Sequence, residues 1–246
     1  MNLILPKIAC LCPTYKRPRL LESALACFTH QDYDPARRRL FIWDDANQFD
    51  SHDGSDWEVI STEERFSDLP AKYNALSKRA MDWGADVLAI WEDDDVFLKW
   101  HLAQIGDACG NRGVHFFRLP QVYSNYALPK GVVQLEGADG RFHSSWAFTV
   151  QAFHAIGGWP KTPRLDFDQQ IGSKLRAFDP QPAFNPFYKP SYVYRWGNGL
   201  FHGSQAGEEG FAELWKRVGD LPAPKQGIAK PVFDEETLRI WETVGR

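Results

Sequence analysis

The order of apolar and amphipathic segments in the first 110 residues predicts an α/β fold with a doubly wound, mainly parallel sheet. Short, continuous apolar runs, typical of strands buried on both faces, alternate with longer segments of helical periodicity. The resulting order, β-α-β-β-α-β, is that of strands joined by crossover helices. Three of the four apolar runs end in polar or acidic residues, at the edge where such sheets bind their ligands.

Each element of this half follows from periodicity and from helix-breaking residues. Strands are expected at 8–12, 40–43, 57–60 and 87–91. Apolar residues recur at helical spacing over 17–31, which predicts a helix there. A second helix is expected over 70–83, because Pro70 is suited to a first turn and Gly84 to a helix end.

The second half is less regular and predicts a smaller, mixed region. Strands are expected at 114–119, 122–126, 132–135 and 142–150, and helices at 151–155, 167–177, 208–218 and 235–244. We expect one continuous domain in three parts: the sheet half at 1–110, the mixed half at 111–204 and a C-terminal helical tail at 205–246.

Composition excludes several classes of protein. The 246 residues carry 28 Lys plus Arg against 32 Asp plus Glu, a net charge of −4 that argues against charge-driven nucleic-acid binding. The N-terminal apolar run is interrupted by Pro6 and Lys7, so neither a signal peptide nor a transmembrane segment is expected, and the predicted location is cytoplasmic. The four cysteines lack metal-ligand spacing and are expected to be reduced, buried hydrophobes.

The polar residues that follow the strands are expected to converge in space. Pro13, Thr14 and Tyr15 end the first strand, Asp44 and Asp45 the second, and the run 92–95 the fourth. Because the carboxyl ends of parallel strands meet at one edge of the sheet, these side chains predict a ligand site there.

The acidic run Glu92-Asp93-Asp94-Asp95 requires a compensating positive charge, because adjacent carboxylates repel one another. In an extended segment Glu92 and Asp94 would face one way and Asp93 and Asp95 the other. Either pair could hold a hard divalent cation, Mn²⁺ or Mg²⁺, through oxygen ligands. The alternative is a solvated acidic turn that caps a helix near Trp100.

Other nucleotide-binding motifs are absent. The chain has no G-x-x-x-x-G-K-[ST] loop, no G-x-G-x-x-G after its first strand and no H-E-x-x-H. A pyrophosphate bridged by a metal is therefore favoured over one held in a glycine loop.

Several strings, in order along the chain, resemble the inverting family 2 glycosyltransferases of the GT-A fold. They are Cys12-Pro-Thr-Tyr-Lys-Arg-Pro, Leu40-Phe-Ile-Trp-Asp-Asp, Leu88-Ala-Ile-Trp-Glu-Asp-Asp-Asp, Ile156-Gly-Gly-Trp-Pro and Asp166-Phe-Asp168. The third resembles the family's DxD segment, and the last two its glycine loop and catalytic acid. Together they cover about 7–204.

The resemblance implies a metal-dependent enzyme that moves a sugar from a nucleoside-diphosphate donor, expected to be a UDP-sugar, to an acceptor hydroxyl with inversion. Residues 1–110 would then bind the nucleotide-sugar and 111–204 the acceptor. The implied nucleotide-sugar ligands are Pro13, Thr14, Tyr15, Arg17, Asp44, Asp45, Lys72, Glu92 and Asp93, with Asp44 on the base and Lys72 on the diphosphate. Simple packing of Tyr15 and a solvated Lys72 are the alternatives.

The implied metal ligands are Asp94, Asp95 and His202, although the family usually has Asp where Glu92 stands, which leaves open which carboxylates touch the ion. Inverting transfer needs a base that deprotonates the acceptor hydroxyl. Asp166 is the first choice and Asp168 the second; one of the two is expected to cap the helix that follows. His143 and His154 are expected to be structural.

The acceptor side is expected to include Trp159, Arg195 and Trp196, with Trp146 as a further candidate, and core packing is the alternative for each. The acceptor itself stays open among a glycan, a lipid-linked glycan, a protein and a modified nucleic-acid base. Two other functions compete with transfer: a sugar-1-phosphate nucleotidyltransferase, for which 13–18 lacks the necessary glycines, and a non-catalytic, metal-dependent sugar-nucleotide-binding module.

Overall fold

The computed structural model describes residues 5–126, 128–138, 140–161, 166–180, 188–196, 213, 216 and 219–245. Its helices are α1 (Pro18–Thr29), α2 (Leu69–Asp82), α3 (His101–Gly106), α4 (Val150–Ala155), α5 (Phe167–Phe178) and α7 (Glu235–Val244), with single turns η1 (Pro35–Arg37), η2 (Asp107–Asn111) and η3 (His143–Ser145). No helix in these residues is both long enough and apolar enough to cross a membrane.

The main sheet of the described chain has seven strands in the order β3-β4-β2-β1-β5-β10-β7. The bounds are β1 Ile8–Thr14, β2 Arg38–Asp44, β3 His52–Asp53, β4 Trp57–Ser61, β5 Val87–Ile90, β7 Phe116–Phe117 and β10 Ala147–Thr149. Strands β4, β2, β1 and β5 pair in parallel, while β3 and β10 run against their neighbours. The predicted mainly parallel α/β sheet is confirmed, and strands from both halves of the chain build it.

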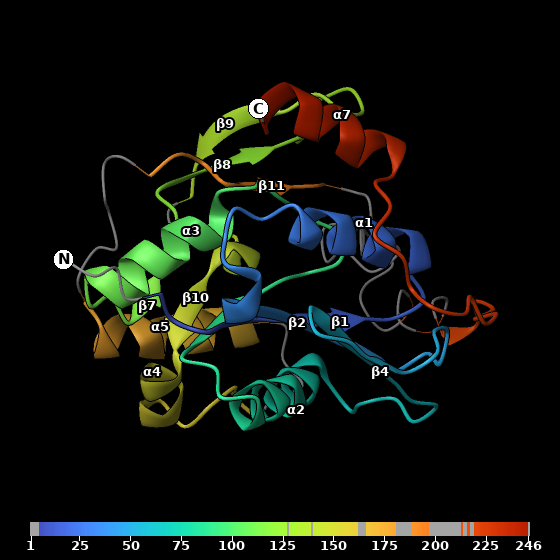
Figure 1. Cartoon of the computed structure of the whole chain (residues 1–246), viewed down its shortest axis with the longest axis horizontal. Coiled ribbons are helices and arrows are strands. Elements are labelled where there is room, and N and C mark those ends of the chain that lie inside the picture. The colour runs from blue at the N-terminus through green and yellow to red at the C-terminus, as the bar shows by residue number, and fades with distance from the viewer. Residues whose placement is uncertain are drawn as a thin grey trace.

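Strict alternation along the central strands creates a core on each face of this sheet. In β1, Ile8, Cys10 and Cys12 join one core with α1, α3 and α7, whereas Ala9 and Leu11 join the other with α2, α4 and α5. Figure 1 shows these two helical layers above and below the strands. Because β1 is buried on both faces, its sequence is continuously apolar, which is what made it predictable.

A second sheet of four described strands, β6-β11-β8-β9, lies on the same side of the main sheet as α1 and α7 (Figure 1). Its strands are β6 (Val96–Phe97), β8 (Gln121–Ser124), β9 (Gln134–Gly137) and β11 (Tyr192–Tyr194). Strand β6 directly follows the acidic run, so pairing of β6 with β11 anchors the end of that run. The predicted mixed region is therefore present, and it borders the acidic residues.

The expected strand at 142–150 is wrong in its first half. Phe142 has a left-handed backbone with φ of 60°, and the single turn η3 follows before β10 begins at Ala147. A left-handed residue cannot continue a β-ladder, so the turn redirects His143 out of the strand. The predicted helix at 235–244 is confirmed as α7, whereas the helix expected at 208–218 lies almost wholly outside the described residues.

One buried histidine predicts how stability depends on pH. His101 is 0% exposed, and burial lowers its pKa to about 3. An unfolded chain binds the proton near pH 6.5 and the folded chain does not, so acid favours unfolding. We expect His101 to remove about 2 kcal/mol of stability between pH 7 and pH 5.

Urea unfolding of the His101→Phe variant at the two pH values tests this expectation. Phe97 and Phe117 already surround the ring, so phenylalanine fits the site in shape and loses only the hydrogen bond of His101 Nδ1 with Ser191 Oγ. The variant should lose less stability than the wild type on acidification, while a variant at the exposed His154, His154→Gln, should behave like the wild type. An unchanged acid sensitivity of His101→Phe would show that other groups cause it.

Candidate functional site

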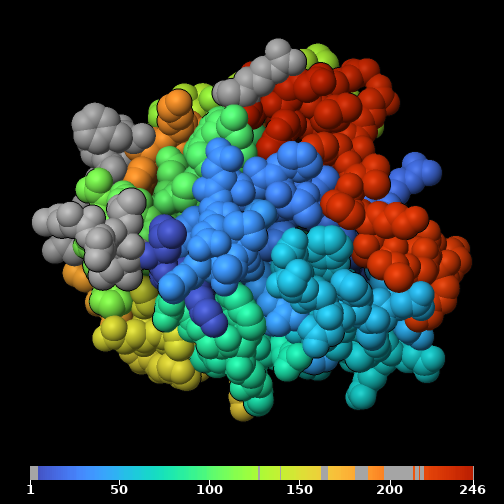
Figure 2. All heavy atoms as spheres, viewed as in Figure 1, coloured from blue at the N-terminus to red at the C-terminus, as the bar shows by residue number. Residues whose placement is uncertain are grey.

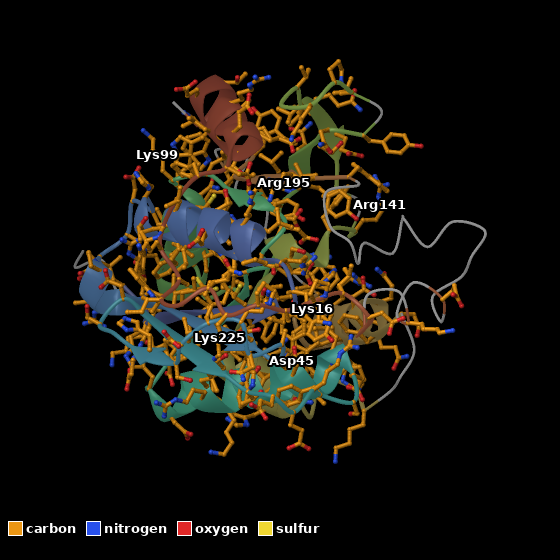
Figure 3. The ribbon with its side chains drawn as sticks, turned by 90° about the vertical axis from the view of Figure 1, so that its right-hand side faces the viewer. Lys16, Asp45, Lys99, Arg141, Arg195 and Lys225 are labelled. Atoms are coloured by element: carbon orange, nitrogen blue, oxygen red, sulfur yellow. The ribbon has the colours of Figure 1, made fainter. Side chains whose placement is uncertain are left out.

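A pocket of about 410 Å³ lies at the carboxyl edge of the parallel strands. Its walls come from the loops that follow β1, β2 and β4 and from the C-terminal segment; the lining residues are Tyr15, Lys16, Asp45, Ala46, Asn47, Glu63, Arg65, Ala223 and Lys225. Figure 3 shows Lys16, Asp45 and Lys225 close together at this edge. The topology thus places a ligand-sized space where the sequence predicted one.

Tyr15 supplies the aromatic surface of this pocket. The guanidinium of Arg65 lies over the Tyr15 ring, 4.1 Å from its centroid. A flat guanidinium and a phenol ring at this distance form a cation–π pair, and the Lys16 ammonium lies 5.3 Å from the same centroid. The stacked Arg65–Tyr15 pair is therefore a flat feature against which a planar ligand can lie. Arg65 was not singled out from the sequence, because it lies in a polar loop without a recognisable motif.

The acidic run forms a compact cluster beside β5. One ligand oxygen from each of Glu92, Asp94 and Asp95 lies within 4.8 Å of the others. Asp93, Asp94 and Asp95 are only 0–3% exposed, so the alternative of a solvated acidic turn is wrong. The cap of α3 is Trp100, which makes no side-chain capping bond, so the run does not cap that helix either.

The expected alternation of side chains along the run is also wrong, because Glu92–Asp95 forms a turn and not an extended segment. Arg17 explains the turn: its guanidinium pairs with Asp93 and, at 2.7 Å, with Asp94 Oδ2. One cation holds two adjacent carboxylates that an extended chain would direct to opposite faces. Arg17, expected on the nucleotide-sugar, is thus part of the compensating charge.

The cluster carboxylates have distinct partners. Tyr73 Oη donates to Glu92 Oε1 at 2.8 Å, and Tyr192 Oη donates to Asp95 Oδ2 at 2.5 Å. Burial, reinforced by the neighbouring Asp94, raises the pKa of Asp95 well above its ordinary value. A crowded, buried set of acids such as this one is stabilised by any cation that binds it.

The residues present fit a hard divalent cation. Oδ1 of Asp94 is buried and accepts no hydrogen bond from the described part of the chain. A buried carboxylate oxygen without a donor is costly unless a cation occupies its free side. Three carboxylates supply the oxygen donors that Mg²⁺ and Mn²⁺ prefer. Glu92 thereby joins the expected ligands Asp94 and Asp95, while His202 lies outside the described residues.

His143, expected to be structural, connects this cluster with the candidate base. Its Nε2 lies 3.0 Å from Glu92 Oε1 and its Nδ1 lies 3.5 Å from Asp168 Oδ2. Burial disfavours the imidazolium, but Glu92 and Asp168 outweigh burial and raise the pKa of His143 to about 9. Burial likewise opposes ionisation of Glu92, but His143 and Tyr73 lower its pKa to about 2.

The two candidate bases sit differently at the start of α5. Asp166 occupies the N-cap position without a side-chain capping bond, and its Oδ1 accepts a hydrogen bond from Gln170 Nε2 at 3.1 Å. Asp168 lies in the first turn, where its Oδ1 accepts from the backbone of Gln169 at 2.8 Å and its Oδ2 faces His143. The contacts of Asp168 therefore lead to the carboxylate cluster.

A buried hydrogen-bond network joins the pocket to the cluster. Lys72 is 4% exposed and donates to Asp45 at 2.5 Å and to the carbonyl oxygen of Thr14 at 2.6 Å. Burial lowers the pKa of Lys72, against the opposing effect of Asp45. The hydroxyl of Thr14 donates to Asp93 Oδ2 at 2.6 Å. The alternative of a solvated Lys72 is therefore wrong.

Asp44 is not available to bind a nucleobase, contrary to expectation. It is 1% exposed, and its oxygens accept hydrogen bonds from the backbone of Ala46, Gln48 and Phe49 and from the hydroxyl of Ser61. Three of these donors share Oδ2 and one reaches Oδ1, so the buried carboxylate is engaged by the protein through both oxygens. Asp44 instead shapes the loop that carries Asp45 into the site.

Pro13, also expected at the nucleotide, is buried within β1, opposite Trp43.

Two expected acceptor residues and one further candidate are core residues. Trp159, 2% exposed, stacks on Tyr73 with ring centroids 4.4 Å apart, and Trp146 is 1% exposed. Arg195 is 1% exposed, and its guanidinium donates to Asp234 at 3.1 Å while its backbone N–H donates to Asp95 at 3.1 Å. Such buried side chains cannot present a face to an acceptor; Arg195 instead ties the acidic run to α7.

Trp196 remains a candidate for the acceptor side. It is half-buried, and its ring lies 4.8 Å from that of Tyr126 and 4.9 Å from that of Tyr194. Tyr126 is 57% exposed. An exposed tyrosine beside a half-buried tryptophan forms an aromatic surface of the kind that contacts sugar rings. Tyr126 was not singled out from the sequence.

Comparison with solved structures identifies the fold. No family model and no curated protein matches the chain. The crystal structure of S. aureus TarS 1–349 in complex with UDP-GlcNAc matches with a TM-score of 0.61 and 15% identity, over 88% of this chain and 68% of that one. The mannosyltransferase PcManGT from Pyrobaculum calidifontis, in complex with GDP-Man and Mn²⁺, matches with a TM-score of 0.53 and 17% identity, over 89% and 66%.

The match to the longer TarS chain has a TM-score of 0.61 and 13% identity and covers 88% of this chain, which corresponds to 41% of that chain. This protein thus spans less than half of that chain. The chain therefore has the GT-A-type fold of these glycosyltransferases.

Proposed function

We propose that the protein is a metal-dependent glycosyltransferase that moves a sugar from a nucleoside-diphosphate donor to an acceptor hydroxyl with inversion. The observation that carries this proposal is the position of the Glu92-Asp94-Asp95 cluster, at the same strand edge as an aromatic pocket of about 410 Å³. A nucleoside and a diphosphate need these two features side by side. Related folds bind UDP-GlcNAc and GDP-Man, which supports a nucleotide-sugar donor.

In this proposal the nucleoside lies against the stacked Arg65–Tyr15 pair, and the diphosphate extends toward the cluster. Glu92, Asp94 and Asp95 would hold Mn²⁺ or Mg²⁺. When bound, such a cation stabilises the negative charge that develops on the departing diphosphate. Thr14 and Lys72 hold Asp93 and Asp45 in place, so the walls of the site are set before the donor arrives.

Asp168 is the proposed base, with Asp166 as the second candidate. A base must lie near the anomeric carbon, and hence near the diphosphate that leaves it. The contact of Asp168 with His143, which in turn contacts Glu92, supports its position beside the cluster. His143 would orient the Asp168 carboxylate. The proposal also includes inversion at the anomeric carbon and the nucleobase of the donor. It further divides the chain into a donor half at 1–110, an acceptor half at 111–204 and a tail.

Incubation with a panel of nucleotide sugars and a mixed set of sugar acceptors tests the proposal. We expect release of a nucleoside diphosphate in Mn²⁺ or Mg²⁺, and loss of that release after chelation. Formation of pyrophosphate from a nucleoside triphosphate and a sugar 1-phosphate would instead identify a nucleotidyltransferase. Tight, metal-dependent binding of the donor without release for any acceptor would identify a binding module.

A further inference from the structure

The C-terminal residues 219–227, here named the strap, cross one side of the pocket. Ala223 and Lys225 line the pocket directly. The ammonium of Lys16, on the loop after β1, donates to the carbonyl oxygen of Gly219 at 2.8 Å and also to that of Leu221. Figure 2 shows the C-terminal residues lying against the residues that follow β2.

The other end of the strap is fixed to the loop after β2. Lys225 Nζ donates to Asn47 Oδ1 at 2.6 Å and to the carbonyl oxygen of Phe49 at 3.1 Å. The backbone of Gln226 donates to Gln48 at 2.6 Å, and that of Asp50 donates to Gly227 at 3.0 Å. The strap is therefore bound to the pocket by both side-chain and backbone hydrogen bonds.

Backbone strain at the pocket coincides with these contacts. Three non-glycine residues of the described chain have a positive φ, and two of them, Lys16 at 57° and Asn47 at 51°, line the pocket. This conformation is costly for Lys16, whereas Asn tolerates it more readily, and non-glycine residues that adopt it cluster at ligand sites. Both side chains are bound to the strap, which supplies that constraint on the loops after β1 and β2.

The hydrogen bonds of Asn47 show what Lys225 does within the pocket. Lys225 Nζ donates to Asn47 Oδ1, and Asn47 Nδ2 donates to Glu63 Oε1 at 3.2 Å. An ammonium only donates hydrogen bonds. A base that presents a carbonyl oxygen to Lys225, as uracil and guanine do, is therefore favoured, whereas adenine presents an amino group at the corresponding edge.

We propose that the strap is a wall of the donor's base subsite and that Lys225 selects nucleotides whose base carries an exocyclic carbonyl oxygen. The proposal rests on the proposed function only in that a nucleotide occupies this pocket. It assigns a binding role to part of the region 205–246, which the sequence predicted only as a C-terminal helical tail.

Calorimetric titration of UDP, GDP and ADP in Mn²⁺ tests the proposal without any need for transfer. The wild type should bind UDP and GDP at least about tenfold more tightly than ADP. Lys225→Met, which keeps the chain length and removes the charge, should weaken UDP and GDP about tenfold and leave ADP nearly unchanged. The matched control Lys230→Met, at an exposed lysine just beyond the strap, should behave like the wild type.

Hydrogen exchange gives a second measurement that needs no variant. Amides of 219–227 should exchange more slowly when UDP is bound, while those of α7 should be unchanged. Wild-type binding that Lys225→Met leaves intact, or weakens equally for all three nucleotides, would overturn the inference alone. A wild type that binds none of the three nucleotides would overturn the proposed function as well.

Discussion

Replacement of Asp94 by alanine is expected to abolish metal-dependent donor binding and to lower sugar transfer by about 10³-fold. Asp94 is the cluster member with a buried oxygen that accepts no hydrogen bond from the described residues. A bound cation is therefore expected to stabilise the Asp94 carboxylate more than the other two. Removal of Asp94 also takes away one of the two carboxylates that pair with Arg17 in the acidic run. Titration of UDP with and without Mn²⁺, together with initial rates of nucleoside-diphosphate release, measures both effects.

The control for this experiment is Asp82→Asn, which removes an exposed carboxylate from α2, where Asp82 pairs with Lys78. It should leave donor binding, metal dependence and rate unchanged, because exposed ion pairs contribute little. Thermal unfolding confirms that each variant is folded. If Asp94→Ala retains a metal-dependent increase in UDP affinity, the cation does not bind at this cluster.

Asp168→Asn is expected to reduce turnover by about 10²–10⁴-fold while donor binding stays intact. The amide keeps the shape of the side chain but cannot accept the acceptor's proton. Asp166→Asn should have a much smaller effect, because the side-chain amide of Gln170 already holds the Asp166 carboxylate on its own helix. Rates at saturating donor, compared with the dissociation constant for the donor, separate loss of chemistry from loss of binding.

The opposite pattern of activity in these two variants would identify Asp166 as the base. Full activity in Asp168→Asn with an inactive Asp166→Asn would restore the order of preference that the family resemblance gives. His143→Gln serves as an additional comparison: the amide can still bridge Glu92 and Asp168, so it should impair turnover less than His143→Ala. Equal effects of the two His143 variants would argue that the bridge does not position the base.

The sheet and its helices were predictable because burial imposes a period on the sequence. β1 is buried on both faces and reads as a continuous apolar run, whereas α7 presents one apolar stripe and was predicted to the residue. The convergence of Asp45 and the 92–95 run followed from topology alone, since parallel strands end at a common edge. The burial pattern of β1 and α7 can be recognised from nearby residues. The convergence of the strand ends follows from the general rule that parallel strands are joined by crossover connections.

The details of the site depend on contacts between distant residues, which the sequence does not display. Arg17 bends the acidic run into a turn across 77 residues of chain, and His143 reaches Glu92 across 51 residues. The indole of Trp159 and the guanidinium of Arg195 are groups that could contact a sugar acceptor, but tertiary packing buries both side chains. Asp44 ends a strand as a ligand residue would, yet its carboxylate is buried and accepts hydrogen bonds from its own loop and from Ser61 of β4.

The strap was missed for a related reason. Its sequence is polar and contains Pro222 and Pro224, which indicates a loop but not what the loop covers. Its hydrogen bonds with the loops after β1 and β2, among them those of Lys16 and Lys225, place it against the pocket. A polar tail can therefore belong to a binding site when its anchors lie on loops far away in the chain.

Release of nucleoside diphosphate from a panel of nucleotide sugars, measured with Mn²⁺ and after chelation, decides whether the protein is a metal-dependent glycosyltransferase. We expect release from at least one sugar donor in the presence of an acceptor, dependent on the metal and lost in Asp94→Ala. Metal-independent release that Asp94→Ala leaves unchanged, or no release from any donor with any acceptor, would contradict it.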